Sequence, residues 1–363
     1  MGFKCGIVGL PNVGKSSLFN ALTSSAIAAE NYAFCTIEPN VGAVAVPDPR
    51  LQRIADIVLP RRVVPSTMEF VDIAGLVEGA SLGEGLGNRF LAHIRETQAL
   101  AHVVRCFDND KVAHVSCRID PISDIEVVET ELALADLETI TRSLENAEKQ
   151  AKSGDKDARE RVECLSELQS GLDAGVAVRA MSLNDATCTL LRQFSLLTAR
   201  PVLFVANVEE SNIGGNTLSA AVEEYAAEHG AETVVLNAAV EAEIATLDPS
   251  ERAEFLTELG LEEPGLNRII RAGYRLLGLQ SFFTADPKVC RAWTVLTGAR
   301  APAAAAVIHT DFERGFIRAE VIGYEDFVTL GGEAGARDAG RMRVEGRDYA
   351  VEDGDVIYFR FNV

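Results

Sequence analysis

The sequence has no long apolar run, and it is short of positive charge. No stretch approaches the ~18 apolar residues that a membrane helix requires, so we expect no membrane-spanning segment. The 363 residues contain 34 Lys and Arg against 54 Asp and Glu, which makes the formal net charge −20. Such a chain repels nucleic acid at long range, so any contact with RNA is expected to use a local basic patch.

Neither a leader segment nor a cysteine pairing pattern is predicted. The first predicted strand begins at residue 3. This leaves no room for a signal peptide, so we expect a cytoplasmic protein with no membrane partner. The seven cysteines are odd in number and include no C-x-x-C pair. This predicts reduced thiols, and it argues against a disulfide scaffold or a zinc site.

The clearest motif that is present lies at residues 9–16, GLPNVGKS, which match G-x-x-x-x-G-K-[ST] in full. A predicted strand precedes the motif and a predicted helix follows it, which is the context of a phosphate-binding P-loop. Lys15 can reach the β- and γ-phosphates, and the Ser16 hydroxyl can bind Mg²⁺. Backbone N–H groups of the loop and the helix N-terminus favour anions. The predicted nucleotide-binding residues here are Asn12, Val13, Gly14, Lys15, Ser16 and Ser17.

Predicted strands alternate with predicted helices over most of the chain. Strand candidates lie at residues 68–72, 102–107, 201–207 and 232–237. This alternation predicts an α/β fold with a doubly wound, mostly parallel sheet that binds ligands at the carboxyl ends of its strands. We place this nucleotide-binding domain at residues 1–123 and 200–277.

Two segments depart from that alternation. Apolar residues spaced three and four apart, at 137–151 and 158–172, flank a polar turn and predict an antiparallel helical hairpin within residues 124–199. The charges of the hairpin are either a solvated face or a partner-binding arm. Residues 278–363 combine strand-like segments with one short helix and are expected to form a small α+β domain.

A nucleotide switch is predicted from two further segments. Asp72 to Gly75 fit D-x-x-G at the end of a strand; Asp72 would hold Mg²⁺ through water, and the Gly75 N–H would contact the γ-phosphate. Thr36 would close over Mg²⁺ and the γ-phosphate. Leu76 stands where many small GTPases have a Gln that orients the attacking water. Either another residue positions this water, or hydrolysis is slow.

The base-reading loop is expected at residues 207–210, NVEE. Guanine-binding P-loop proteins use N-K-x-D there, with the Asp accepting from the guanine N1–H and amino group. Here Asn207 is kept, while Val208 replaces the Lys and Glu210 replaces the Asp. Adenine N1 is an acceptor, and the longer Glu210 moves the carboxylate, which argues against GTP.

These motifs together resemble the YchF family, the Obg-like ATPases, along the whole chain. The likeness rests on the P-loop sequence, the N-x-x-E loop and the helical insertion. It also rests on residues 315–320 and 353–356, which are similar to a TGS domain, a ubiquitin-like β-grasp module. The resemblance implies ATP preference over GTP, ribosome-stimulated hydrolysis, association with the large subunit or 70S ribosome, and a link to oxidative stress.

The resemblance also implies roles for single residues. Asn237 and Ala238 would lie in the loop near the base, although residues 237–239 read NAA where the family more usually has Ser-Ala-Lys. A His at the position of His114 is proposed in the family to act in hydrolysis, and a neutral imidazole could orient or deprotonate water. Otherwise His114 is an ordinary loop residue. Cys35 adjoins Thr36 and is a redox candidate in a family called redox-regulated, or else a small packed residue.

The function that the sequence favours is a Mg²⁺-dependent ATPase of the YchF type that binds the ribosome, with rRNA contacts through local basic patches. Basic residues gather at the predicted hairpin tip and in the C-terminal domain. Two alternatives stay open. One is a GTPase of similar design. The other is a nucleotide-gated assembly module with negligible turnover, which Leu76 makes conceivable.

Overall fold

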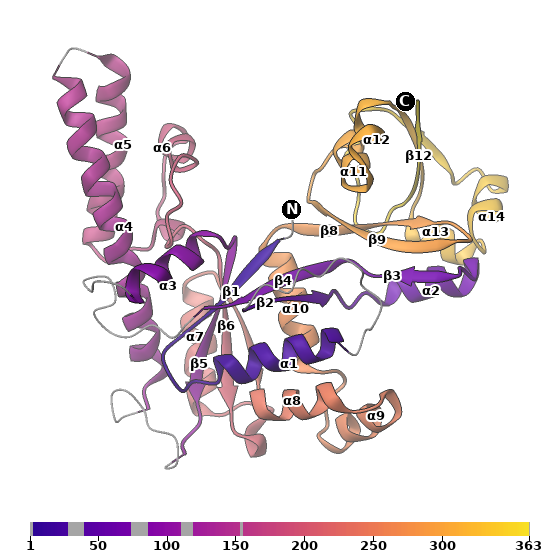
Figure 1. Ribbon diagram of the computed structural model, residues 1–363, viewed down its shortest axis with the longest axis horizontal. Helices are drawn as coiled ribbons and strands as arrows, with labels where there is room; N and C mark the ends of the chain where they lie inside the picture. Colours follow the sequence, from indigo (N-terminus) through magenta and orange to yellow (C-terminus); the bar gives the residue numbers. More distant parts are fainter. Residues whose placement is uncertain (1–2, 28–39, 74–85, 110–118, 153–154, 363) are drawn as a thin grey trace. The chain divides into compact units, whose positions relative to one another are not determined.

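The structure is a computed structural model that describes residues 3–27, 40–73, 86–109, 119–152 and 155–362 (Figure 1). By internal contacts the chain divides into two compact units. The first comprises residues 3–42 and 69–269, and the second comprises residues 43–68 and 270–363. None of the described helices is long and apolar enough to cross a membrane.

The first unit is built around a six-stranded sheet of order β2-β4-β1-β5-β6-β7. Strand β1 pairs in parallel with β4 and with β5, and β5, β6 and β7 continue the parallel pairing. Every residue of β5 and β6 is buried, as expected for central strands covered on both faces. The predicted doubly wound, mostly parallel sheet is therefore confirmed. The strand bounds are β1 Lys4–Val8, β2 Val41–Ala45, β4 Thr67–Asp72, β5 Ala99–Cys106, β6 Val202–Val208 and β7 Glu232–Leu236.

Helices connect these strands. Two of them position the site described below: α1 (Lys15–Ile27) follows β1, and α8 (Ala238–Thr246) follows β7; they pack side by side in Figure 1. This packing brings the start of the chain next to a segment more than 200 residues later. The other helices of the sheet region are α3 Leu86–Arg95, α7 Thr217–Glu228, α9 Pro249–Glu258 and α10 Gly265–Leu276.

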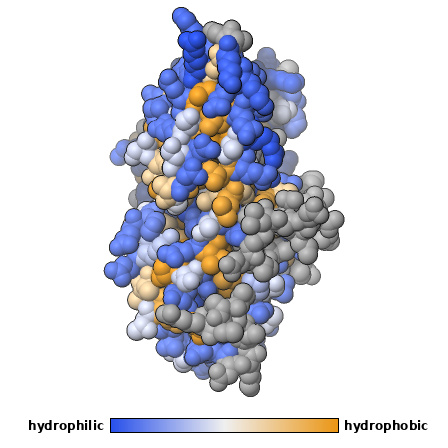
Figure 2. Space-filling view, turned by 90° about the vertical axis from the view of Figure 1, so that its left-hand side faces the viewer, coloured by the Kyte–Doolittle hydropathy of each residue, from blue (hydrophilic) through white to orange (hydrophobic). Residues whose placement is uncertain are grey.

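The predicted helical hairpin is formed by α4 (Pro121–Ala151) and α5 (Lys156–Asp173) (Figure 1). Asp120 caps α4 by accepting from the Ser123 N–H, and a proline at the first helical position fits the missing N–H there. The apolar residues that define the periodicity face each other across the seam, and Figure 2 shows hydrophobic side chains along the hairpin between hydrophilic flanks. The insertion continues with η1 (Val178–Ala180) and α6 (Asp185–Leu191).

The base of the hairpin is tied to the chain that returns to the sheet. The buried Asp136 carboxylate of α4 accepts from the Leu197 N–H at 2.8 Å and from the Thr198 N–H and hydroxyl at 2.8 and 2.7 Å. Arg179 forms an ion pair with Glu129 of α4 at 2.6 Å. Three hydrogen bonds to one buried carboxylate hold the middle of α4 against the chain that returns to the sheet.

The second unit contains another six-stranded sheet, of order β11-β10-β12-β8-β9-β3. Its strands are β3 Arg62–Val64, β8 Leu279–Ala285, β9 Val289–Leu296, β10 Phe316–Ile322, β11 Arg343–Glu345 and β12 Val356–Phe361. Its helices are α2 Pro49–Val58, α11 Ala301–Ile308, α12 Thr310–Arg314, α13 Tyr324–Thr329 and α14 Glu333–Asp338.

Residues 43–68 contribute α2 and β3 to this second unit. Leu51 and Ile54 of α2 share a buried apolar core with Phe283 and Phe327. Arg50 forms an ion pair with Asp353 at 2.8 Å. A segment that the sequence places within the nucleotide-binding domain therefore completes the core around the C-terminal sheet.

Candidate nucleotide-binding site

The turn between β1 and α1 has the backbone that a P-loop requires. Gly9 and Gly14 have φ of 145° and 104°, and Asn12 has φ of 63°. A Cβ atom at Gly9 would overlap the carbonyl oxygen of Val103 on β5, and one at Gly14 would overlap the side-chain amide of Asn207. Only glycine accommodates both the positive φ and the close approach.

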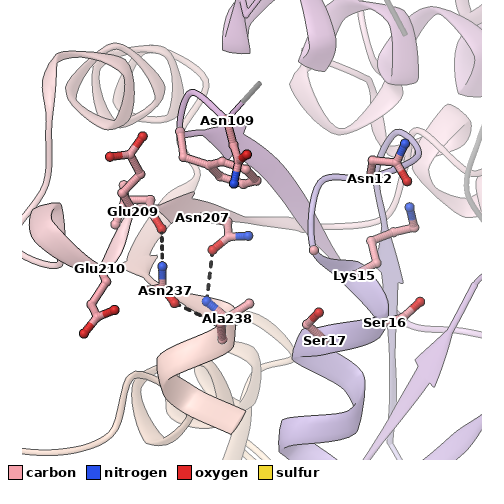
Figure 3. Close-up of a pocket in the computed structure, with 14 residues that line it drawn as sticks. Asn12, Lys15, Ser16, Ser17, Asn109, Asn207, Glu209, Glu210, Asn237 and Ala238 are labelled. Atoms are coloured by element: carbon pink, nitrogen blue, oxygen red, sulfur yellow. Dashed lines mark hydrogen bonds between the residues drawn. The ribbon is translucent and has the colours of Figure 1, made fainter. Parts of the chain in front are cut away.

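Asn207, at the end of β6, links the P-loop to the loop after β7. Its side-chain amide nitrogen donates to the Val13 carbonyl at 2.9 Å. Its amide oxygen accepts from the Ala238 N–H at 3.0 Å (Figure 3). The residue is only 5% exposed. Its amide is thus used on both sides by protein groups, so Asn207 sets the spacing of the two loops.

Asn237 and Ala238 form the loop that Asn207 holds. Asn237 caps α8: its side-chain oxygen accepts from the Ala239 and Val240 N–H groups at 3.0 and 2.8 Å. Its amide nitrogen donates to the Val208 carbonyl at 2.6 Å. The NAA sequence therefore builds an ordered helix start beside the end of β6.

A cavity of about 550 Å³ opens between these loops, at the carboxyl ends of the parallel strands (Figure 3). Its size lies within the range of small-molecule sites. Of the predicted nucleotide-binding residues, Val13 is the one that does not line it, because its side chain is buried. The lining residues are Asn12, Gly14, Lys15, Ser16, Ser17, Phe107, Asn109, Asn207, Val208, Glu209, Glu210, Asn237, Ala238 and Ala239.

One side of the cavity is the P-loop. Lys15 is 7% exposed, and its Nζ donates to the Leu10 carbonyl at 2.6 Å. Burial lowers the pKa of Lys15 to about 8, and the charge of Asp72 opposes this shift. Burial raises the pKa of the Asp72 carboxyl, and Lys15 opposes that shift in turn. A buried cation and a carboxylate at the end of β4 thus interact where phosphates would lie.

Two of the predicted metal ligands are described residues with oxygen donors suited to a magnesium ion. The Ser16 hydroxyl lies at the start of α1 and lines the cavity. The Asp72 carboxylate ends β4, and Asp72 is not among the residues that line the cavity. Hydroxyl and carboxylate oxygens are the hard donors that Mg²⁺ takes, with phosphate oxygens and water completing an octahedron. The chemistry of this donor set therefore fits Mg²⁺.

The opposite side carries the expected base-reading loop. Glu210 opens the short helix η2 (Glu210–Asn212) and is exposed at the cavity, across from Lys15 in Figure 3. The Val208 side chain is only 1% exposed because it belongs to β6. It cannot take the place of a lysine stem packed on a base, so the contribution of Val208 here is its backbone.

Two lining residues, Phe107 and Asn109, lie outside the segments predicted from the sequence, and two others, Glu209 and Ala239, lie in the predicted loops at 207–210 and 237–239 without having been named as ligand residues. Phe107 and Asn109 directly follow β5, so their position after a buried central strand is the signal that could have identified them. Four predicted residues, Thr36, Gly75, His114 and Cys35, lie outside the described residues, as does Leu76.

Comparisons with known proteins find relatives along the whole chain. A family model described as 50S ribosome-binding GTPase matches residues 4–151, and the model YchF-GTPase_C, described as a protein of unknown function, matches residues 279–362. Proteins named ribosome-binding ATPase YchF from Haemophilus influenzae and Bacillus subtilis are 58% and 51% identical, each over 100% of both chains. The solved structure of the Schizosaccharomyces pombe YchF GTPase matches with a TM-score of 0.90 and 33% identity, covering 99% of this chain and 98% of that one.

Proposed function

This chain belongs to the YchF family, and from that membership we propose that it is a ribosome-binding ATPase that hydrolyses ATP in preference to GTP. The observation that carries the proposal is the cavity. It lies between a complete P-loop with a buried Lys15 and the loop at residues 207–210, in which Glu210 stands in place of an aspartate. Full-length relatives 51–58% identical to the chain carry the name ribosome-binding ATPase, which supports the same assignment.

At the phosphate end, Lys15 and the N–H groups of residues 12–17 bind the phosphate oxygens of the nucleotide. Ser16 and Thr36 would hold Mg²⁺ there together with phosphate oxygens, and Asp72 would hold it through water. The ion, when bound, neutralises negative charge that develops on the transferred phosphoryl group. Lys15 adds a second positive charge at the same place, where its burial from water strengthens the attraction.

At the base end, Glu210, Asn237 and Ala238 contact the base. A guanine site needs a carboxylate at aspartate length and an apolar lysine stem over the ring. Neither is present, because Glu210 is longer and Val208 is buried in β6. This favours adenine over guanine.

Hydrolysis uses residues that are assigned here from their positions in the sequence. The Gly75 N–H contacts the γ-phosphate, and His114 orients the attacking water in place of the missing glutamine. Cys35 adjoins Thr36, so its oxidation would disturb the switch.

The partner is the ribosome, in the cytoplasm. Beside the nucleotide-binding domain at residues 1–123 and 200–277, the hairpin at residues 124–199 and the TGS domain at residues 278–363 supply the contacts. With a net charge of −20, binding to rRNA depends on local basic patches.

The test compares Mg²⁺-dependent hydrolysis of ATP and GTP, with and without 70S ribosomes, for the parent, Lys15→Ala and Ser16→Ala. We expect ATP to be the better substrate, ribosomes to stimulate its hydrolysis, and both variants to lose activity by about 100-fold or more. GTP hydrolysed faster than ATP would favour the GTPase alternative. Tight ATP binding with no more turnover than Lys15→Ala would favour the nucleotide-gated module.

A further inference from the structure

One wall of the cavity is the loop after β5, residues 107–109. A buried arginine at the end of β5 donates hydrogen bonds to this loop. Arg105 is 1% exposed. Its Nε donates to the Phe107 carbonyl at 3.1 Å, and one Nη donates to the Asn109 carbonyl at 3.3 Å. Its guanidinium carbon lies 4.6 Å from the centre of the Phe107 ring. A buried guanidinium is costly unless its donors are used, so these bonds couple the conformation of the loop to the strand.

The loop that follows the neighbouring strand β6 also bonds to this wall. The Asp108 N–H donates to Oε1 of Glu209 at 3.1 Å. Glu209 directly follows β6, and its carboxylate joins the two loops that end β5 and β6. Asn216 adds a bond on this side, since its amide nitrogen donates to the Cys106 carbonyl at 2.7 Å. The loop is therefore anchored at the Cys106, Phe107 and Asn109 carbonyls and at the Asp108 N–H.

We propose, on the basis of the function proposed above, that Arg105 and Glu209 are positioning residues that preorganise this wall for the base of the nucleotide. The wall lines the cavity together with Glu209, Glu210 and Asn237, on the side away from Lys15. When a binding loop is ordered only part of the time, the apparent affinity falls by the fraction that is competent. Loss of these anchoring bonds therefore lowers the affinity for ligands that have a base, while ligands made only of phosphate keep their affinity.

Glu209 offers the sharper test, because it is partly exposed and its removal leaves the buried network intact. Glu209→Ala removes the acceptor for the Asp108 N–H. Glu209→Gln keeps an oxygen acceptor but removes the charge. Glu224→Ala, on the exposed face of α7, makes the same charge change away from the cavity. Arg105→Lys is a second test from the other side: it keeps the charge and loses the planar fork.

The measurements use the full chain. Calorimetry gives the affinity for Mg²⁺–ATP and for Mg²⁺–tripolyphosphate, and amide hydrogen exchange without ligand gives the protection of the Asp108 N–H. We expect Glu209→Ala to weaken ATP binding by about three- to tenfold and to leave tripolyphosphate binding within about twofold. Exchange at Asp108 should accelerate in the same variant. Glu209→Gln and Glu224→Ala should match the parent, and Arg105→Lys should show the ATP-selective loss.

Three results would overturn the proposal: unchanged ATP affinity in Glu209→Ala, equal weakening of ATP and tripolyphosphate, or accelerated exchange at Asp108 with no loss of ATP affinity. If Arg105→Lys does not fold, the Glu209 series decides. A parent protein that binds tripolyphosphate no more weakly than ATP, with Asp108 protected by Glu209, would contradict the proposed base site while leaving the anchoring of the wall established.

Discussion

Asn207→Asp changes one atom of the residue that joins the two loops of the site. An aspartate can still accept from the Ala238 N–H, but its ionised carboxylate cannot donate to the Val13 carbonyl. Two oxygen atoms would then face each other where the structure has a 2.9 Å hydrogen bond. Water cannot relieve the repulsion between these two oxygen atoms, because Asn207 is only 5% exposed. The substitution therefore perturbs the P-loop without changing the size of the side chain.

The expected cost follows from the contacts. The lost hydrogen bond contributes about 1 kcal/mol, and a buried carbonyl left unpaired costs about 1–3 kcal/mol more. We expect the free energy of unfolding of the first unit to fall by about 2–4 kcal/mol at pH 7. The loss should shrink as the pH falls toward about 4, because a protonated carboxyl group can donate to the Val13 carbonyl again. ATP affinity should fall as well, because Val13 belongs to the loop that binds phosphate.

The assay is urea unfolding of the full chain at several pH values, together with calorimetry for Mg²⁺–ATP. The chain has two compact units, so amide exchange within β1 and β6 identifies the transition of the first unit. Asn20→Asp, on the exposed side of α1, is the matched control and should stay within about 0.5 kcal/mol of the parent. An Asn207→Asp protein as stable as this control, with unchanged ATP affinity, would refute the bridging role.

Three further predictions concern pH, base choice and the ribosome. Burial lowers the pKa of His102 to about 3, so the unfolded chain binds more protons than the folded one between pH 6.5 and 3. The contribution of His102 to stability is complete above about pH 6.5, and it falls on acidification by up to about 1.4 kcal/mol per pH unit. Urea unfolding midpoints should show a smaller loss on acidification in His102→Phe. Glu210→Asp restores the carboxylate length of guanine sites, and the ratio of ATP to GTP dissociation constants should move toward GTP by about tenfold or less; a move toward ATP would contradict the assigned role. Replacing the basic residues of the hairpin tip with Glu should weaken cosedimentation with ribosomes; these residues are Lys149, Lys152, Lys156 and Arg159. The slope of binding against salt concentration should fall by roughly one unit per lost phosphate contact, with ATP affinity unchanged. Ribosome binding equal to that of the parent would exclude the tip as a contact.

The elements that could be predicted from the sequence are those whose cause is local. A tight turn with positive φ at Gly9 and Gly14 needs glycine, so the P-loop is visible in eight consecutive letters. The hairpin is visible because apolar residues three and four apart lie on one face of a helix. The central strands are visible because strands covered on both faces are apolar throughout. In each case the residues that carry the signal are close together in the chain.

The remaining features depend on which segments become neighbours in space. The bond from Asn207 to Val13 joins residues 194 positions apart, and the burial that lowers the pKa of Lys15 requires the assembled sheet. Residues 43–68 join the second unit because α2 completes an apolar core around β8. The wall held by Arg105 and Glu209 exists because β5 and β6 are adjacent and parallel, so the loops at their carboxyl ends meet. Local sequence determined the strands, helices and phosphate loop of this protein. Only the tertiary structure revealed the loop after β5 as a wall of the cavity and the bonds that join the loops, because strand order is set by long-range packing that no short sequence pattern encodes.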